Sequence, residues 1–503
     1  MTRRLITPSS THAAGTAAPP PAASRPGYNE LMAPLRCLGI SPSVLRSPRA
    51  EESDEEDDDT NQSSTLSAKK KKKFYTIVTS DLLIPGDGDP IADGALVVEA
   101  KTIVWVGTRD AIPAEYTGAA HKAHHVPYIM PGLWDVHLHF AGASLDPEDV
   151  PKTMVLGSYG VHPASQGARL AKQCWQALQM GYTSMRDCGG FGCEMAAAIN
   201  DGSIVGPNVY GAGAYISQTA GHGDQFDMPP GDVLLGFGVN NIRPGFFCDQ
   251  TGMLADGADE CRRAVRLQVR RGAKCIKILA TGGITSLDDD PRDAQFCDEE
   301  MFALVDESNR MGRAVAAHCH AKAGIIASIK AGVTTIEHGS YADEECIDLM
   351  KKHDIIFVPT RCAITLLLGI GDELPKKVIN KVRMIAKIHW EAYKMAVAKG
   401  VTIAMGTDII PSEVRGLEIQ HGVEAGMTNL QALKAATATA PLTLGRQAPK
   451  SGQLKVGYDA DILGLTENPT EDVKVLQKGE NIKWVWKGGK LFKGPNVGPW
   501  GEE

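Results

Sequence analysis

Two histidines that lie two residues apart are the first sign of chemistry in this sequence. They are His137 and His139, in the stretch WDVHLHF. Side chains two residues apart in a strand point to the same face, so both imidazoles can reach one metal ion. A lone histidine in a strand is more often a core or surface residue than a ligand, so the pair needs further partners.

Side chains of the same chemical kind follow other apolar runs. AAHCH contains His318 and His320, TIEHGS contains His338, and AMGTD contains Asp408. Imidazole and carboxylate donors without a matched set of cysteines favour zinc or a similar divalent ion. The sequence therefore predicts a metal site, provided that the fold brings these residues together.

A lysine inside an apolar run is the second unusual feature. In RGAKCIKILATGG, Lys277 shares strand parity with Cys275 and Leu279, whereas Lys274, three residues earlier, has the opposite parity. We therefore expect Lys277 to point inward and Lys274 to be solvated. A buried ammonium group is costly without a partner, so Lys277 is expected to lie at the site.

The elements that must position these residues alternate between strand-like and helix-like stretches from about 131 to 445. Near-continuous apolar runs are typical of parallel strands that are buried on both faces. Glycine often ends the helix-like stretch before a strand. Eight such units predict an α/β fold, a (β/α)₈ TIM barrel, with functional residues at the carboxyl ends of its strands. The predicted strands are residues 134–139, 182–187, 208–213, 275–280, 313–318, 333–338, 355–359 and 402–407.

The segments on either side of this region have a different texture. Residues 74–130 and 446–503 contain short runs rich in Val, Ile and aromatic residues, interrupted by Gly, Pro and Asp. Gly488-Gly489 suits a tight hairpin turn. We expect the two segments to form one small β-sandwich domain, and residues 1–73, which have a biased composition, to be a disordered leader.

Composition limits the class of protein. The chain has 503 residues, a formal net charge of −8 and 11 Cys. The negative charge argues against a nucleic-acid binder, no apolar run reaches the roughly 20 residues that span a bilayer, and scattered cysteines fit reduced thiols. Without an apolar core for a secretory signal, we expect a cytoplasmic protein with no membrane partner, and secretion by another route stays open.

Several stretches resemble one family, the fungal ochratoxinase-type amidohydrolases, in the imidazolonepropionase-like and metal-dependent carboxypeptidase branch of the amidohydrolase superfamily. The matching stretches are IMPGLWDVHLHF, HPASQGARLAKQCWQALQMGYTS, SQTAGHGD, IKILATGGITS, APLTLGRQAP and VWKGGKLFKGPNVGPWGE. The resemblance runs from about Phe74 to the C-terminus. It implies a metal-dependent hydrolase of amide bonds that forms a large homo-oligomer, such as an octamer.

The resemblance also implies a site with two divalent metal ions, expected to be zinc. The first ion would be held by His137, His139 and Asp408, the second by His318 and His338, and Lys277 would bridge both as a CO₂-derived carbamate. Burial lowers the pKa of a lysine and so exposes an amine that can add CO₂. The ions would share a hydroxide that attacks the amide, and Asp408 would carry its proton to the leaving nitrogen.

The substrates that the resemblance suggests are N-acyl amino acids or peptides with a free carboxylate. Ochratoxin A is one example, and its hydrolysis would give ochratoxin alpha and phenylalanine. The carboxylate requires a cation or a hydrogen-bond donor. The candidates are Arg361 just after the seventh strand, His320 on the same face as His318, and His222 in the glycine-flanked stretch TAGHGD. A structural ion pair is the alternative role for Arg361.

Other functions stay open at this point. An imidazolone or cyclic-amide hydrolase, or a Xaa-Pro dipeptidase, would use the same ligands. A non-enzymatic scaffold is disfavoured because such relatives usually lose ligands, whereas every ligand position is filled here. An anionic-surface or nucleic-acid module rests on Lys69–Lys73 alone.

Overall fold

The structure is a computed structural model that describes residues 73–142, 163–226, 228–240, 251–411 and 415–502. The chain divides into two units, residues 1–70 and 71–503, and every described residue belongs to the second. The predicted disordered leader, residues 1–73, therefore lies outside the described part except for its last residue.

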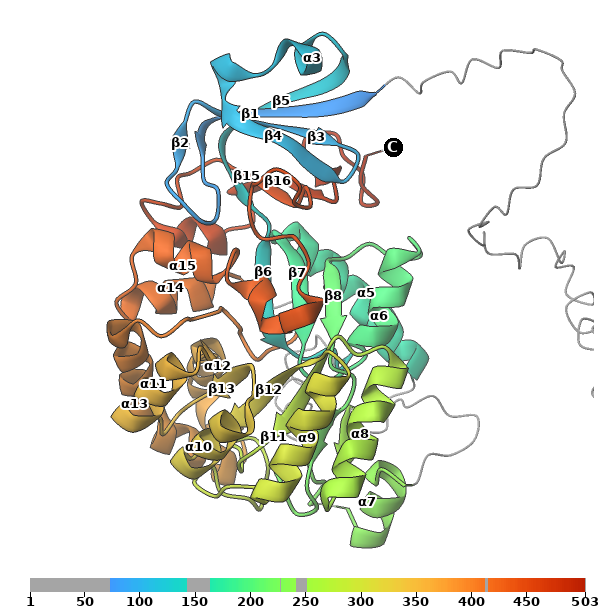
Figure 1. Cartoon of the computed structure of the whole chain (residues 1–503), viewed down its shortest axis with the longest axis vertical. Helices are drawn as coiled ribbons and strands as arrows, with labels where there is room; N and C mark the ends of the chain where they lie inside the picture. Colours follow the sequence, from blue (N-terminus) through green and yellow to red (C-terminus); the bar gives the residue numbers. More distant parts are fainter. Residues whose placement is uncertain (1–72, 143–162, 227, 241–250, 412–414, 503) are drawn as a thin grey trace, which may run out of the picture. The chain divides into compact units, whose positions relative to one another are not determined.

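One sheet unites strands from the two ends of the described chain (Figure 1). Its strand order is β17-β16-β15-β5-β1-β3-β4, and β2 pairs with β1. The strands are β1 (Phe74–Leu83), β2 (Ile91–Ala92), β3 (Gly94–Glu99), β4 (Thr102–Thr108), β5 (Ala120–Pro131), β15 (Ile462–Leu465), β16 (Ile482–Lys487) and β17 (Lys490–Lys493).

The hairpin β16–β17 forms where the sequence predicts it. Gly488 and Gly489 have φ of 53° and 76°, as the two central residues of a tight hairpin turn require. Val78, Ile129 and Trp486 are buried in the apolar core of this sheet. The segments 74–130 and 446–503 thus share a sheet, and their separate sandwich domain stays a prediction.

Parallel strands and helices alternate in the central region. Strands β6 (Leu133–Leu138), β7 (Tyr182–Asp187) and β8 (Asn208–Gly211) form one sheet. A second sheet has the order β10-β9-β11-β12-β13-β14, built from β9 (Tyr215–Ser217), β10 (Gly252–Leu254), β11 (Cys275–Leu279), β12 (Ala314–Cys319), β13 (Thr335–His338) and β14 (Ile356–Val358). The first seven predicted strands correspond to β6, β7, β8, β11, β12, β13 and β14, whereas β9 and β10 were not predicted.

The eighth predicted strand, residues 402–407, is wrong as a strand. This segment makes only isolated bridges, Phe357 with Ile403 and, just beyond it, Leu138 with Ile409. Asp408, just after the segment, has a φ of 59°, outside the extended region, so the chain leaves the strand direction there. The named strands form two parallel sheets rather than one closed sheet of eight, so closure into a barrel stays a prediction.

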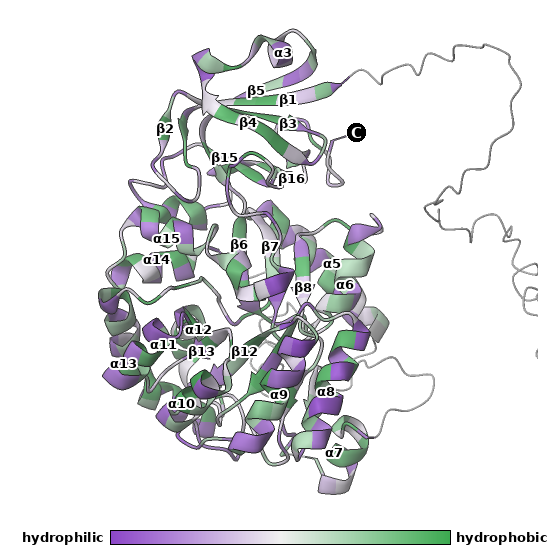
Figure 2. Cartoon of the chain, viewed as in Figure 1, coloured by the Kyte–Doolittle hydropathy of each residue, from purple (hydrophilic) through white to green (hydrophobic). Residues whose placement is uncertain are grey.

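The helices show the caps and faces that their sequences favour. In α8 (Ala258–Arg271), residues 261, 264, 265 and 268 are buried at the spacing of one helix face. Figure 2 shows hydrophobic and hydrophilic stretches alternating along α8 and α9 (Asp298–Arg310). Gly272, Gly332 and Gly400 end α8, α10 (Lys322–Ala331) and α13 (Lys376–Lys399) with φ of 116°, 91° and 71°, as predicted. Among the described helices, none combines the length and the apolar character needed to cross a membrane.

The helices are α3 (Ala114–Thr117), α5 (Pro163–Gln179), α6 (Gly192–Asn200), α7 (Pro230–Phe237), α8 (Ala258–Arg271), α9 (Asp298–Arg310), α10 (Lys322–Ala331), α11 (Glu344–Lys352), α12 (Arg361–Ile370), α13 (Lys376–Lys399), α14 (Leu417–Glu424) and α15 (Asn429–Ala435). Short 3₁₀ helices are η2 (Arg109–Ala111), η3 (Gly371–Glu373), η5 (Ala440–Gln447) and η6 (Val473–Gln477).

Candidate metal centre

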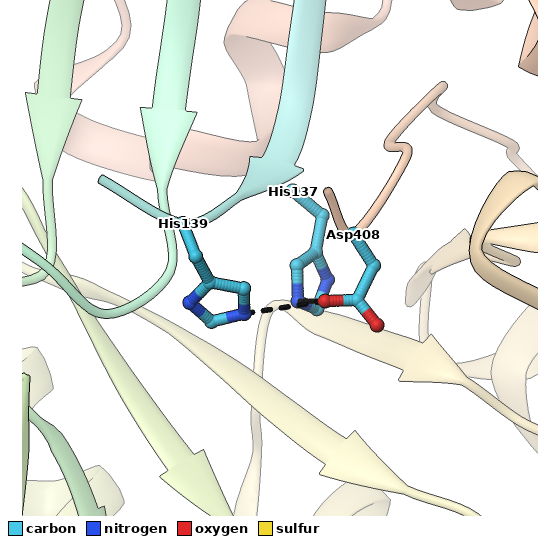
Figure 3. Close-up of side chains that lie close together, drawn as sticks. All are labelled: His137, His139 and Asp408. Carbon is cyan, nitrogen blue, oxygen red and sulfur yellow. Dashed lines mark ion pairs between the residues drawn. The ribbon is translucent and has the colours of Figure 1, made fainter. Parts of the chain in front are cut away.

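His137, His139 and Asp408 lie side by side, two at the end of β6 and one after the segment 402–407 (Figure 3). Their donor atoms all lie within 4.8 Å of one another. Oδ1 of Asp408 is 3.2 Å from Nε2 of His139 and 3.5 Å from Nε2 of His137. The backbone N–H groups of residues 407 and 408 both donate to the carbonyl of His137, which fixes the carboxylate beside the two imidazoles.

The other predicted histidines join this group through ring contacts. The ring of His338 lies 5.0 Å from that of His137 and 4.5 Å from that of His318, centroid to centroid. His320 lies 4.7 Å from His318, and His222 stacks on His318 at 4.4 Å. The residues that the sequence assigned to separate strand ends therefore meet in one cluster.

Lys277 faces this cluster from β11. Its side chain is buried, and Nζ lies 3.0 Å from Nε2 of His137. Lys274 is exposed, so the inward and outward parity predicted for the two lysines is confirmed. The role of Lys277 as a metal ligand stays a prediction.

Most of these imidazoles are held by their outer nitrogen. The partner of Nδ1 is Oε2 of Glu337 for His137 (2.6 Å), O of Gly189 for His139 (2.9 Å), Oγ of Ser340 for His320 (2.8 Å) and Oγ1 of Thr360 for His338 (2.7 Å). His318 differs, because its Nε2 lies 3.3 Å from O of Gly282. An outer acceptor on one nitrogen leaves the other free to bind a metal or a substrate.

The donor chemistry of the cluster fits a divalent ion. Nε2 of His137 and of His139 both face the carboxylate of Asp408. Nε2 of His320 is buried and has no hydrogen-bond partner among the described residues. Nitrogen and carboxylate donors that converge in this way are the usual ligands of zinc.

The charges of the cluster suit the same role. Burial, followed by the charge of Lys277, lowers the pKa of His137 to about 4, and burial lowers the pKa of His318 and His338 well below the ordinary value. Burial alone would raise the pKa of Asp408, but His137 and the hydrogen bond from His139 lower it to about 2. At neutral pH His137, His318 and His338 are therefore neutral and the carboxylate is ionised, as metal ligands must be. For His139, burial would lower the pKa, but the hydrogen bond to Asp408 outweighs it and raises the pKa above the ordinary value.

Three residues at the centre adopt a backbone conformation that the sequence did not reveal. His338, Thr360 and Asp408 have φ of 69°, 55° and 59°. Left-handed non-glycine residues cost free energy and concentrate at functional sites. In this protein they turn the ends of β13, β14 and the segment 402–407 toward the cluster.

A buried ion pair behind the cluster was also missed. Glu337 and Arg186 are both fully buried, and Nη2 of Arg186 is 2.7 Å from Oε1 of Glu337. On a regular strand Glu337 would face away from its neighbour His338, so alternation excluded it. The available signal was an acidic residue inside the apolar stretch TIEHGS.

The predicted substrate residues lie in different surroundings. Arg361 begins α12, where its Nη1 donates to O of Ala386 (2.6 Å) and its guanidinium lies over the ring of Trp390 (5.1 Å). These contacts lie on α13 and not in the histidine cluster. His222 lies in the cluster, and its Nδ1 is 2.8 Å from Oγ of Ser286.

Comparisons with known proteins agree with this geometry. Residues 128–492 match the sequence model of the Amidohydrolase family. Ochratoxinase from Aspergillus niger is 53% identical over 430 residues, which cover 85% of this chain and 88% of that protein. Its crystal structure superposes with a TM-score of 0.81 over 86% of this chain and 99% of that one, at 52% identity. A Xaa-Pro dipeptidase structure with bound methionine has 26% identity and a TM-score of 0.70 over 84% and 100% of the two chains.

Proposed function

The chain belongs to the amidohydrolase family and hydrolyses amide bonds, and from this premise we propose that it releases the C-terminal amino acid of N-acyl amino acids or peptides with a free carboxylate. The observation that carries the proposal is the convergence of His137, His139 and Asp408 with Lys277. The 53% identity to an ochratoxinase supports ochratoxin A as one substrate.

Two divalent ions, with zinc as the expected metal, would be held by the clustered residues. His137, His139 and Asp408 would bind the first, His318 and His338 the second, and Lys277 would bridge them as a carbamate. When bound, such ions lower the pKa of water and polarise a carbonyl. Ligand histidines must be neutral, which the lowered pKa values of His137, His318 and His338 allow.

Asp408 is the group that would move a proton. Its side chain is 26% exposed, so water and substrate can reach it. Its carboxylate is ionised at neutral pH because His137 and His139 lower its pKa. It would accept a proton from the attacking water and deliver that proton to the leaving nitrogen.

Substrate binding would involve groups on the His318 side of the cluster. Nε2 of His320 is free for a hydrogen bond, since Ser340 occupies Nδ1. His222 is oriented by Ser286 in the same way. We assign these two histidines to the acyl amino acid and Arg361 to its carboxylate.

The same proposal includes closure of the barrel and formation of a homo-oligomer. The parallel strands would close into a (β/α)₈ barrel, supported by the hydrogen bond from N of Lys274, just before β11, to O of Gly211 at the end of β8 (2.8 Å), which links the two sheets. Homo-oligomerisation, with an octamer as the expected form, rests on the resemblance alone, and sedimentation of the purified chain tests it.

The testing experiment combines metal analysis with an assay for amino-acid release. The panel contains ochratoxin A, N-acyl-phenylalanines, dipeptides and an imidazolone. Two divalent ions per chain and release of phenylalanine are expected, and a metal-free active protein would contradict the proposal. Release of proline from Xaa-Pro peptides alone would favour the second candidate, a Xaa-Pro dipeptidase, to which the 26% identical structure points. Ring opening would indicate a cyclic-amide hydrolase.

A further inference from the structure

The buried pair of Arg186 and Glu337 has contacts that reach the proposed metal centre. Both side chains are 0% exposed. Arg186 also donates from Nη1 to Oγ1 of Thr335 (3.2 Å) and from Nε to O of Val136. Glu337 uses its second oxygen, Oε2, to contact Nδ1 of His137 at 2.6 Å.

Stability alone does not explain why this pair is present, because a buried ion pair is often no more stabilising than an apolar pair of the same size. Its position beside His137 suggests a role in the metal centre. Glu337 lies between the guanidinium of Arg186 and the imidazole of His137. The Nδ1 atoms of His139 and His338 have neutral oxygens of Gly189 and Thr360 within hydrogen-bond distance, and the nearest carboxylate oxygen to Nδ1 of His338 lies 3.9 Å away on Asp408. The contact between Glu337 and Nδ1 of His137, at 2.6 Å, is a charged one at hydrogen-bond distance.

The contact determines which nitrogen of His137 carries the proton. An ionised carboxylate only accepts hydrogen bonds, so Nδ1 must carry the proton and Nε2 keeps its lone pair. Nε2 is the atom that faces Lys277 (3.0 Å) and Asp408 (3.5 Å). The guanidinium of Arg186, 2.7 Å from Oε1, supplies the positive charge that an ionised Glu337 needs in a fully buried position.

We propose that Arg186 and Glu337 are positioning residues of the metal centre, in which Arg186 holds the carboxylate and Glu337 fixes His137 as the tautomer whose Nε2 binds the ion. The inference rests on the proposed function. A carboxylate behind a ligand histidine raises its basicity, and loss of such a partner typically costs about 10- to 100-fold in metal affinity.

Glu337→Gln is the sharpest test because Arg186 has no acceptor. The amide oxygen of this variant is drawn to Arg186, so its NH₂ group faces Nδ1 and favours the opposite tautomer of His137. The protein is stripped with a chelator, and its zinc affinity is measured by competition with a chelating dye. We expect an affinity about 10- to 100-fold lower than that of the unmodified chain.

Thermal unfolding with and without zinc separates positioning from mere structural support. A ligand that binds the folded state raises Tm, and at a fixed ligand concentration the increment grows with the logarithm of its affinity. Asp461→Asn is the matched control, since Asp461 is 3% exposed and accepts hydrogen bonds from Gly488 and Asn208, away from the cluster. It should lower Tm and leave the zinc-induced increment unchanged, whereas Glu337→Gln should reduce that increment.

The outcomes are distinguishable. If the unmodified chain gains no stability from zinc, the proposed function fails. If it does and Glu337→Gln binds zinc equally well, the positioning role is overturned. Should Glu337→Gln not fold, Thr335→Val removes the hydroxyl that contacts both Arg186 and Glu337 and keeps the charges. We expect a few-fold loss of zinc affinity in that variant, and an unchanged affinity would overturn the inference.

Discussion

Nζ of Lys277 lies 3.0 Å from Nε2 of His137, and both side chains are buried. The imidazole is neutral at pH 7, because burial and Lys277 lower its pKa to about 4. The carboxylate of Asp408 faces Nε2 of the same ring, and the carboxylate of Glu337 contacts Nδ1. The amine of Lys277 therefore lies beside imidazole and carboxylate groups that can bind metal ions. Bound cations would stabilise an anion formed on this amine.

Replacing this lysine should abolish the bridge between the proposed ions. In Lys277→Ala we expect less than two metal ions per chain and hydrolysis lowered by at least about 100-fold, since a ligand should matter more than an outer partner. Lys274→Ala is the control, because Lys274 is three residues away and exposed. This variant should keep two metal ions and full hydrolytic activity. Metal analysis with the release assay decides, and two bound ions with full activity in Lys277→Ala would contradict the assignment.

The role of Arg361 is tested by paired substrates. If its guanidinium binds the substrate carboxylate, Arg361→Ala should raise KM for free acids much more than for the corresponding amides. Contacts with Ala386 and Trp390 also make the side chain part of the α12–α13 packing, so a lower Tm is expected in the same variant. A lower Tm with equal effects on the two substrate sets would leave Arg361 a structural residue.

Removal of residues 1–73 should leave hydrolysis unchanged. The match to the family begins at residue 128, and every residue of the cluster lies between His137 and Asp408. The truncated chain and the full chain are compared for release of phenylalanine and for Tm. Loss of activity at an unchanged Tm would show that the leader takes part in catalysis.

Much of the fold could be predicted because buried parallel strands have nearly continuous apolar sequences. The exception, residues 402–407, follows a different constraint. Gly406 lies so close to β6 that an added Cβ would be 2.6 Å from Cβ of His137, and the left-handed Asp408 then leaves the strand direction. Local propensity does not encode such a close approach, which depends on tertiary contacts.

The site shows the same division. Strand alternation correctly predicted that His137 and His139 share one face and that Lys277 and Lys274 face opposite sides, because these residues lie on or beside regular strands. It failed for Glu337, since the left-handed φ of 69° at His338 lets neighbouring residues contact the same centre. Arg186 could not be found at all, because its partner is about 150 residues away in sequence.

The last prediction concerns Glu418, a buried acid at the start of α14 whose carboxylate accepts hydrogen bonds from N of Arg361 (3.0 Å) and N of Cys362 (2.6 Å). Burial raises its pKa to about 8, although these two hydrogen bonds oppose the change. The folded state therefore binds a proton that the unfolded state has released between about pH 4.5 and 8.

The sign follows from this difference in bound protons: the contribution of Glu418 to the free energy of unfolding is fully present below about pH 4.5 and is lost as pH rises through about 8. Glu418→Gln removes the titration. Its Tm should therefore fall furthest below that of the unmodified chain near pH 5, and the gap should shrink by pH 8, which thermal unfolding in a pH series measures. The control is Glu424→Gln, which replaces an exposed acid on the same helix, because the pKa of Glu424 is lowered and not raised. A gap for Glu418→Gln that is constant or grows with pH would mean that the two backbone hydrogen bonds outweigh burial and hold this carboxylate ionised.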